Sequence, residues 1–140
     1  MTKILKIRAR QVFDSRGNPT VEAEVYSNKL SASAICPSGA STGTYEAFEK
    51  RDKNNKKYLG KSVLSAVNLV NTKISQKLSG TNIHDQTRID TTLINFDGTI
   101  QKSNLGANSI LAVSMAAKKL SAKIKKIPLY KTFLVTNNFK

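Results

Sequence analysis

Cysteine, tryptophan and long apolar runs are scarce or absent in this sequence of 140 residues, and each absence excludes a class of protein. Cys36 is the only cysteine, so an internal disulfide is excluded and we expect a reducing, cytoplasmic location. No apolar run approaches the roughly 20 residues that a membrane-spanning helix needs. The early charges in MTKILKIRAR are unlike a secretory signal peptide, so neither a membrane anchor nor export is predicted.

Acidic residues are also few, with 9 Asp and Glu against 23 Lys and Arg, a formal net charge of +14. Domains that bind nucleic acid usually concentrate their cations and interleave aromatic or Arg side chains. Here the cations are mostly lysines spread along the chain, which favours a solvated surface over nucleic-acid binding. The sequence after Asp97 contains lysines and no acidic residue, so an acidic protein partner stays open as an alternative.

The first 36 residues show the alternation of apolar and polar residues that is typical of half-buried strands. Residues 4–13, 21–25 and 30–36 are the three expected strands, separated by turn-forming residues at 14–19 and 28–29. The inward side chains are predicted to be Leu5, Ile7, Ala9, Val21, Ala23 and Val25. Glu22 and Glu24 point outward and can pair with the cations of the first strand. The sequence therefore predicts a three-stranded antiparallel meander.

Helical spacing of apolar residues begins after residue 62 and continues almost to the end. It predicts one helix over 63–78 ended by Gly80, one over 86–96 with Asp85 as N-cap and Gly98 at its end, and one over 105–124. The last is expected to be buried almost all round, on Ile110, Leu111, Ala112, Val113, Met115, Ala116, Ala117, Leu120 and Ile124. A short helical or extended piece follows Pro128. Strands followed by helices indicate an α+β fold with helices on one face of the sheet.

The segment PSGASTG at residues 37–43 is the densest local signal for a binding site. Its glycines allow close approach to a ligand, and its hydroxyl and carbonyl oxygens are hard donors suited to Mg²⁺. It lacks the Gly-Lys-Ser/Thr ending of a phosphate-binding P-loop. Taken alone, the segment also fits an ordinary connection without function.

Six segments appear in the order and at the spacings found in enolases: DSRGNPT (14–20), PSGASTGTYEA (37–47), KYLGK (57–61), FDGT (96–99), KSNLGANSILAVSMA (102–116) and PLY (128–130). The chain thus resembles the amino-terminal domain of the enolase family over nearly its whole length. The resemblance implies an α+β domain at residues 1–134, in which a meander precedes three to four helices. It also implies that residues 135–140 begin a linker to a carboxyl-terminal barrel outside this sequence.

The resemblance assigns roles to individual residues. Ser41 matches the loop serine that binds the second, substrate-dependent Mg²⁺ as the loop closes over the substrate phosphate. The surrounding residues Gly39, Ala40, Thr42 and Gly43 would form the frame of this lid, with Ala40 near the substrate. Arg10 and Arg16 match arginines that reach acidic residues of a partner subunit across the dimer interface, so a homodimer or a higher homo-oligomer is implied. An alternative for both arginines is that they are outward cations of a strand and a turn.

Enolases convert 2-phosphoglycerate to phosphoenolpyruvate in glycolysis, and their catalytic residues lie on the barrel. No catalytic residue is therefore expected within these 140 residues, and we expect them to be inactive alone. The alternative from another class is a stand-alone interaction module that binds an acidic protein or nucleic acid. Racemases and cycloisomerases of the wider superfamily share the architecture but lack the PSGASTG string.

Two further residues invite a chemical reading. Cys36 is expected to be a buried strand residue and not a reactive thiol, because no base lies beside it in the sequence. His84 is the only histidine and has no second ligand residue nearby. We expect it to serve at the surface or near the helix start, and not as a metal ligand.

Overall fold

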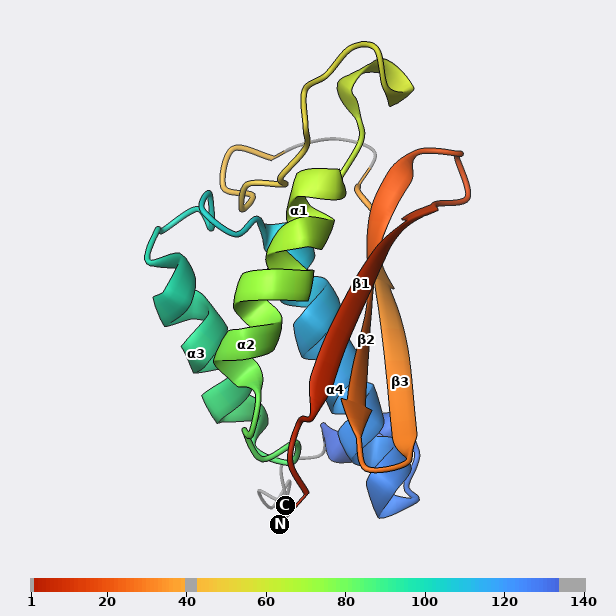
Figure 1. Ribbon diagram of the computed structural model, residues 1–140, viewed down its shortest axis with the longest axis vertical. Coiled ribbons are helices and arrows are strands. Elements are labelled where there is room, and N and C mark those ends of the chain that lie inside the picture. The colour runs from red at the N-terminus through yellow and green to blue at the C-terminus, as the bar shows by residue number, and fades with distance from the viewer. Residues whose placement is uncertain (1, 40–42, 134–140) are drawn as a thin grey trace, which may run out of the picture.

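A three-stranded sheet with helices packed against it forms the structure, a computed structural model that describes residues 2–39 and 43–133 (Figure 1). The strands are β1 (Lys6–Phe13), β2 (Pro19–Ser27) and β3 (Leu30–Cys36), paired antiparallel in the order β1-β2-β3. The predicted meander and the α+β class are confirmed. The pairing of Arg10 with Glu22 and Glu24 across β1 and β2 is confirmed as well.

The start of the first strand differs from the prediction. Leu5 was expected to face the core, but it is 58% exposed while Ile4 is fully buried. The Ile4 N–H donates to the Thr81 carbonyl (2.8 Å), and the Gly80 N–H donates to the Ile4 carbonyl (2.8 Å). The chain therefore pairs first with residues 80–83 and passes to β2 at Leu5, whose N–H donates to the Tyr26 carbonyl (2.9 Å), so the alternation is broken there.

The helix predicted over 63–78 consists of three consecutive segments: α1 (Leu64–Leu69), the π-helical η2 (Val70–Ile74) and α2 (Ser75–Leu78). The other long helices are α3 (Gln86–Asp97) and α4 (Ala107–Lys125). Short 3₁₀ turns occupy η1 (Tyr58–Gly60) and η3 (Leu129–Thr132). Among the described residues, no helix is both long and apolar enough to cross a bilayer.

The predicted limits of α3 are confirmed by their contacts. Asp85 accepts a hydrogen bond from the Arg88 N–H (3.0 Å), as an N-cap should. Gly98 has a positive φ of 72°, the left-handed conformation that commonly ends a helix.

The core lies between the sheet and the helices, with α4 packed on β2 and β3 and the segment from α1 to α2 packed on β1 (Figure 1). The expected burial of α4 almost all round is wrong, because Leu111 is 48% exposed and Ile110 and Ile124 are only half-buried. The buried face of α4 combines the small residues Ser109, Ala112, Ala116 and Ala117 with the larger Val113 and Leu120. Small side chains let the helix axis approach the strands closely, and Ile110, Leu111 and Ile124 lie at the margin of this contact.

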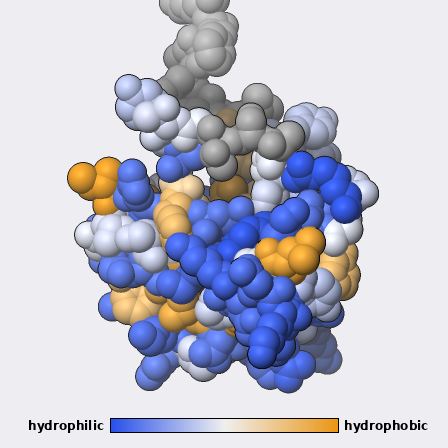
Figure 2. Space-filling model, turned by 90° about the horizontal axis from the view of Figure 1, so that it is seen from above, coloured by the Kyte–Doolittle hydropathy of each residue, from blue (hydrophilic) through white to orange (hydrophobic). Residues whose placement is uncertain are grey.

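The β1–β2 turn and the long loop between β3 and α1 lie at one end of the molecule (Figure 1), which Figure 2 shows from above. Hydrophilic residues cover most of this visible surface, and hydrophobic residues form small separate groups. The loop with the PSGASTG segment belongs to this end, between β3 and α1.

Candidate functional site

The candidate site is the loop that leaves β3 at Cys36. Gly39 and Gly43 are exposed, and the Glu46 N–H donates to the Gly43 carbonyl (3.2 Å) in a tight turn. Ala40, Ser41 and Thr42 lie outside the described residues. The structure therefore describes the two ends of the loop, up to Gly39 and from Gly43 onward.

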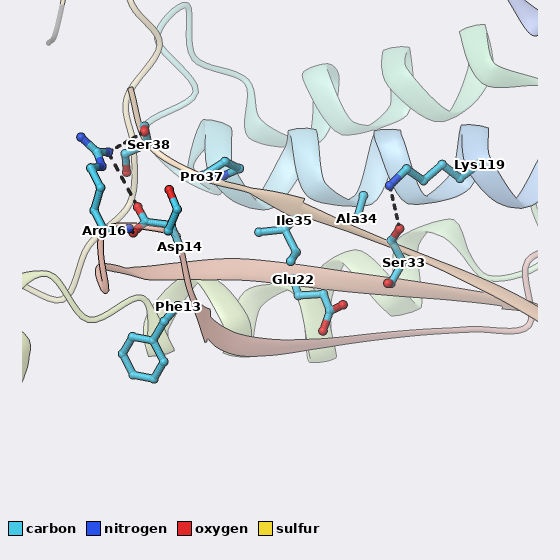
Figure 3. Close-up of a pocket in the computed structure, with 11 residues that line it drawn as sticks. Phe13, Asp14, Arg16, Glu22, Ser33, Ala34, Ile35, Pro37, Ser38 and Lys119 are labelled. Carbon is cyan, nitrogen blue, oxygen red and sulfur yellow. Dashed lines mark hydrogen bonds and ion pairs between the residues drawn. The ribbon is translucent and has the colours of Figure 1, made fainter. Parts of the chain in front are cut away.

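Arg16 binds the first end of the loop from the β1–β2 turn (Figure 3). Its guanidinium donates to the carbonyls of Ser38 (2.8 Å) and Gly39 (3.3 Å). Asp14 shapes that turn, because its Oδ1 accepts the N–H groups of Asn18 and Arg16 (2.9 Å each). These bonds, with the one from Asn18 foremost, hold the pKa of the Asp14 carboxyl below its usual value.

A three-residue polar cluster of Ser38, Glu49 and Arg51 ties both ends of the loop together. The Ser38 hydroxyl donates to Glu49 Oε1 (2.6 Å), and the Arg51 guanidinium donates to Ser38 Oγ (2.5 Å) and to Glu49 Oε1 (2.9 Å). Arg51 also donates to the carbonyls of Pro19 (3.2 Å) and Lys61. One half-buried guanidinium thus joins the loop to the start of β2 and to the approach to α1.

The second end of the loop is clamped to the start of α4. The Ala107 N–H donates to the Phe48 carbonyl (2.8 Å). The buried Asn108 side chain accepts the Lys50 N–H (3.1 Å) and donates to the Lys50 carbonyl (3.0 Å). Gly106 permits this approach, because it has a φ of 90° and a Cβ there would lie 2.5 Å from Lys50 Cβ.

Two hollows adjoin these anchors. A smaller one of about 370 Å³ is lined by Ser38, Gly39, Gly43 and residues 46–49. A larger open one of about 750 Å³ lies beside the β1–β2 turn and the end of β3 (Figure 3). Its lining mixes the acids Asp14 and Glu22 with the cations Arg16 and Lys119. The anchored ends of the loop thus border both hollows, since Ser38 lines each of them.

Residues 4–133, which include the meander and the anchored loop, match the family described as Enolase, N-terminal domain. The chain belongs to the enolase family. It is 87% identical over all 140 residues to the enolase of Pelagibacter ubique (strain HTCC1062). Those residues span 34% of that enolase, so about a third of the relative's length is represented here.

The described part of this enolase domain contains no group of three or more His, Cys, Asp or Glu residues that could hold a metal ion. The hydroxyl of Ser38 is already bound to Glu49 and Arg51, and the carbonyls of Ser38 and Gly39 face Arg16. The donor chemistry of residues 2–39 and 43–133 therefore does not fit a complete Mg²⁺ site.

The two interface candidates have different surroundings. Arg10 forms ion pairs with Glu22 (3.2 Å) and Glu24 (2.6 Å) on the outer face of the sheet, and its side chain stays 53% exposed. The pKa of Glu24 is lowered by hydrogen bonds from Tyr26 and Ser31 and by the Arg10 charge. Arg16 is bound to the loop carbonyls. Both contacts lie within the chain, and an intersubunit role for either arginine stays a prediction.

Cys36 and His84 both lack the environment of a reactive group. Cys36 was expected to be buried, but it is only half-buried. Its partial burial, and to a smaller extent the charge of Glu49, raise the pKa of the thiol to about 11. His84 Nδ1 contacts the Ser121 hydroxyl (2.9 Å), and burial and then Lys125 lower its pKa. These contacts agree with a structural role for both residues.

Sequence reasoning found the loop and missed its anchors. Glu49 and Arg51 were not among the predicted site residues, and an acid and a cation two positions apart, a few residues after a glycine-rich loop, are the only local signal for them. Asn108 lay inside a quoted motif, but its pairing with Lys50 joins residues 58 positions apart, which no local pattern reveals.

Proposed function

We propose that this chain is the lid-bearing amino-terminal part of an enolase that reversibly dehydrates 2-phosphoglycerate to phosphoenolpyruvate in glycolysis. The 87% identity to an enolase over the whole chain is the observation that carries the proposal. In this assignment residues 1–134 are the domain and residues 135–140 begin the linker to the barrel. The anchored loop supports the proposal, because a lid needs fixed ends.

Within this proposal, Ser41 supplies its hydroxyl and carbonyl oxygens to the second Mg²⁺ of the enzyme. Bound Mg²⁺ supplies electrostatic stabilisation of the negative charge that develops on the substrate. Gly39, Ala40, Thr42 and Gly43 form the frame of the lid, and Ala40 lies near the substrate. Support comes from the hard oxygen donors of the segment and from the fixed positions of Ser38 and Glu49 on either side of it.

The chain's own task is to bind, orient and exclude water, and proton transfer belongs to the remainder of the enzyme. Arg16 and Arg51 hold carbonyl and hydroxyl oxygens at the first end of the loop, while Asn108 holds the second. A loop whose ends are fixed loses little entropy when it covers a bound phosphate. The chain alone is therefore proposed to be inactive.

The proposal includes a cytoplasmic homodimer in which Arg10 and Arg16 approach acidic residues of the second subunit. The Arg10 side chain, which is 53% exposed, supports this because its guanidinium has more donors than the two ion pairs use. Nucleic acid is not a proposed partner, because the lysines are dispersed along the chain.

A domain exchange tests the proposed function. This chain replaces the matching 34% of the Pelagibacter ubique enolase, and turnover of 2-phosphoglycerate is measured for the fusion and for the chain alone. The fusion is expected to show turnover within tenfold of the parent enolase, and the chain alone none. A folded but inactive fusion, or turnover by the chain alone, contradicts the proposal.

A further inference from the structure

The outer edge of β1 is closed by side chains and backbone along most of its length. The Ser75 hydroxyl accepts the Ile7 N–H (3.2 Å). The Asn71 side chain accepts the Ala9 N–H (2.7 Å) and donates to the Ala9 carbonyl (3.1 Å). Backbone bonds of Ile4 to Thr81 and Gly80 continue the closure toward the amino terminus. The segment from α1 to α2 therefore takes the place of a neighbouring strand.

The outer edge of β3 is closed in another way, by two ammonium groups from α4. Lys119 Nζ donates to the Ser33 carbonyl (3.2 Å) and Lys123 Nζ donates to the Ser31 carbonyl (3.0 Å). Figure 3 shows the Lys119 contact along the rim of the sheet. Both lysines are exposed, so the closure depends on flexible side chains.

The spacing of these contacts matches the geometry of a helix beside a strand. Four residues of a helix advance about 6 Å, and two residues of a strand advance between about 6 and 7 Å. Lys119 and Lys123 therefore reach alternate carbonyls of β3 in step. Alternate residues of an antiparallel edge strand direct both N–H and C=O away from their neighbour, so Ser31 and Ser33 are the residues that a further strand would contact.

We propose that Lys119 and Lys123 keep β3 closed to strand pairing, and that the strand they exclude is β3 of a second copy of this chain. A free strand edge is a template for pairing, and lysine is a common means of blocking one. Leu30 and Ile35 add to the attraction, being 40% and 44% exposed on the same strand. Two copies of β3 can pair antiparallel about a twofold axis, which makes the contact identical for both.

The test compares the self-association of the 140-residue chain with that of three double variants, using sedimentation equilibrium. Lys119→Ala with Lys123→Ala removes both donors and keeps a good helix former. Lys56→Ala with Lys125→Ala is the charge-matched control, because it removes two positive charges away from β3. Lys125 lies about 200° around the axis of α4 from Lys123. Lys119→Arg with Lys123→Arg keeps both charge and donors. Amide hydrogen exchange at Ser31, Ser33 and Ile35 is measured for each.

The first variant is expected to self-associate at least tenfold more tightly than the unsubstituted chain, with slowed exchange at the three β3 amides. The charge-matched and arginine variants are expected to stay within threefold of the unsubstituted chain. The proposal is overturned by equal association of the alanine variant and its charge-matched control. It is also overturned if association rises while the β3 amides exchange as fast as before.

Discussion

Two asparagine side chains bind both backbone groups of a single residue far away in the sequence, as a neighbouring strand would. Asn71 does this for Ala9 on an exposed edge, and Asn108 does it for Lys50 beside the core. An amide side chain carries one acceptor and two donors, so it satisfies an N–H and a C=O together. At Asn108 this contact fixes the residues that follow the candidate loop.

Asn108→Ala is expected to lower the free energy of unfolding by about 2 to 3 kcal/mol, because two hydrogen bonds are lost and a partly buried N–H and C=O are left without partners. Urea unfolding followed by circular dichroism measures the change. Asn68→Ala is the control, since Asn68 lies exposed within α1 and its replacement should change stability by less than about 0.5 kcal/mol. Equal effects of the two substitutions contradict the clamp.

The Cys36 thiol is expected to react with iodoacetamide at pH 8 about 100-fold more slowly in the folded chain than in the urea-unfolded chain. A pKa raised to about 11 from 9.0 leaves about a hundredth of the usual thiolate, which is the reacting form. Mass spectrometry of timed samples gives both rates. Comparable rates in the two states would show that the folded thiol is not desolvated.

At the level of elements, local patterns predicted the sheet well. The bounds of β3 agree with the prediction residue for residue, because Asn28 and Lys29 form a tight turn that sets where it begins. β2 begins earlier than the alternation indicated, at Pro19, which lies at the end of the ladder opposite Phe13. A proline is tolerated at the first residue of a strand, so the sequence pattern alone placed the boundary too late.

The helices show where local reasoning fails. The pattern of large apolar residues pointed Ile110 and Leu111 into the core, but the buried face of α4 is centred on Ser109, Ala112 and Ala116. Close packing on the sheet selects small side chains, and this depends on a partner element that periodicity does not include. The π-helical η2 was missed for a similar reason, since its Asn71 meets Ala9 of the distant β1.

For the candidate site, sequence motifs identified the loop by its residue types, and the structure added the contacts that hold it. Arg16 was assigned by resemblance to a subunit interface, but within this chain its guanidinium binds the carbonyls of Ser38 and Gly39. An arginine in a turn gives no sign of which distant carbonyls it will contact. The same holds for Arg51, which links four segments.

For the whole molecule, the free energy of unfolding is expected to decrease in two stages as the pH is lowered. The pKa of His84 is lowered in the folded state. As the pH falls below about 6.5, His84 is therefore protonated more readily in the unfolded chain, which destabilises the fold. The pKa values of Asp14, Glu24, Asp52 and Asp97 are lowered too, so their contribution is present above about pH 4 and is lost below it.

Thermal unfolding between pH 8 and pH 3 measures this dependence. The midpoint is expected to decline slightly from pH 7 to pH 5 and steeply below pH 4, where the net charge also rises above +14. Asp97→Asn should lessen the steep part, because Asp97 accepts the Leu105 N–H (2.7 Å) and the Thr99 N–H (3.0 Å) as a carboxylate. A midpoint that rises on acidification contradicts the assigned shifts.

The proposed role of the loop is tested most directly by the Mg²⁺ dependence of 2-phosphoglycerate turnover in the fusion with the remainder of the Pelagibacter ubique enolase, comparing Ser41→Ala with a Ser15→Ala control. Ser15→Ala is expected to leave both turnover and its Mg²⁺ dependence unchanged, since Ser15 is an exposed turn residue. Ser41→Ala is expected to lower turnover at least tenfold and to shift the Mg²⁺ requirement for the second ion upward, while the first ion still binds. An unchanged Mg²⁺ dependence in Ser41→Ala would contradict the account.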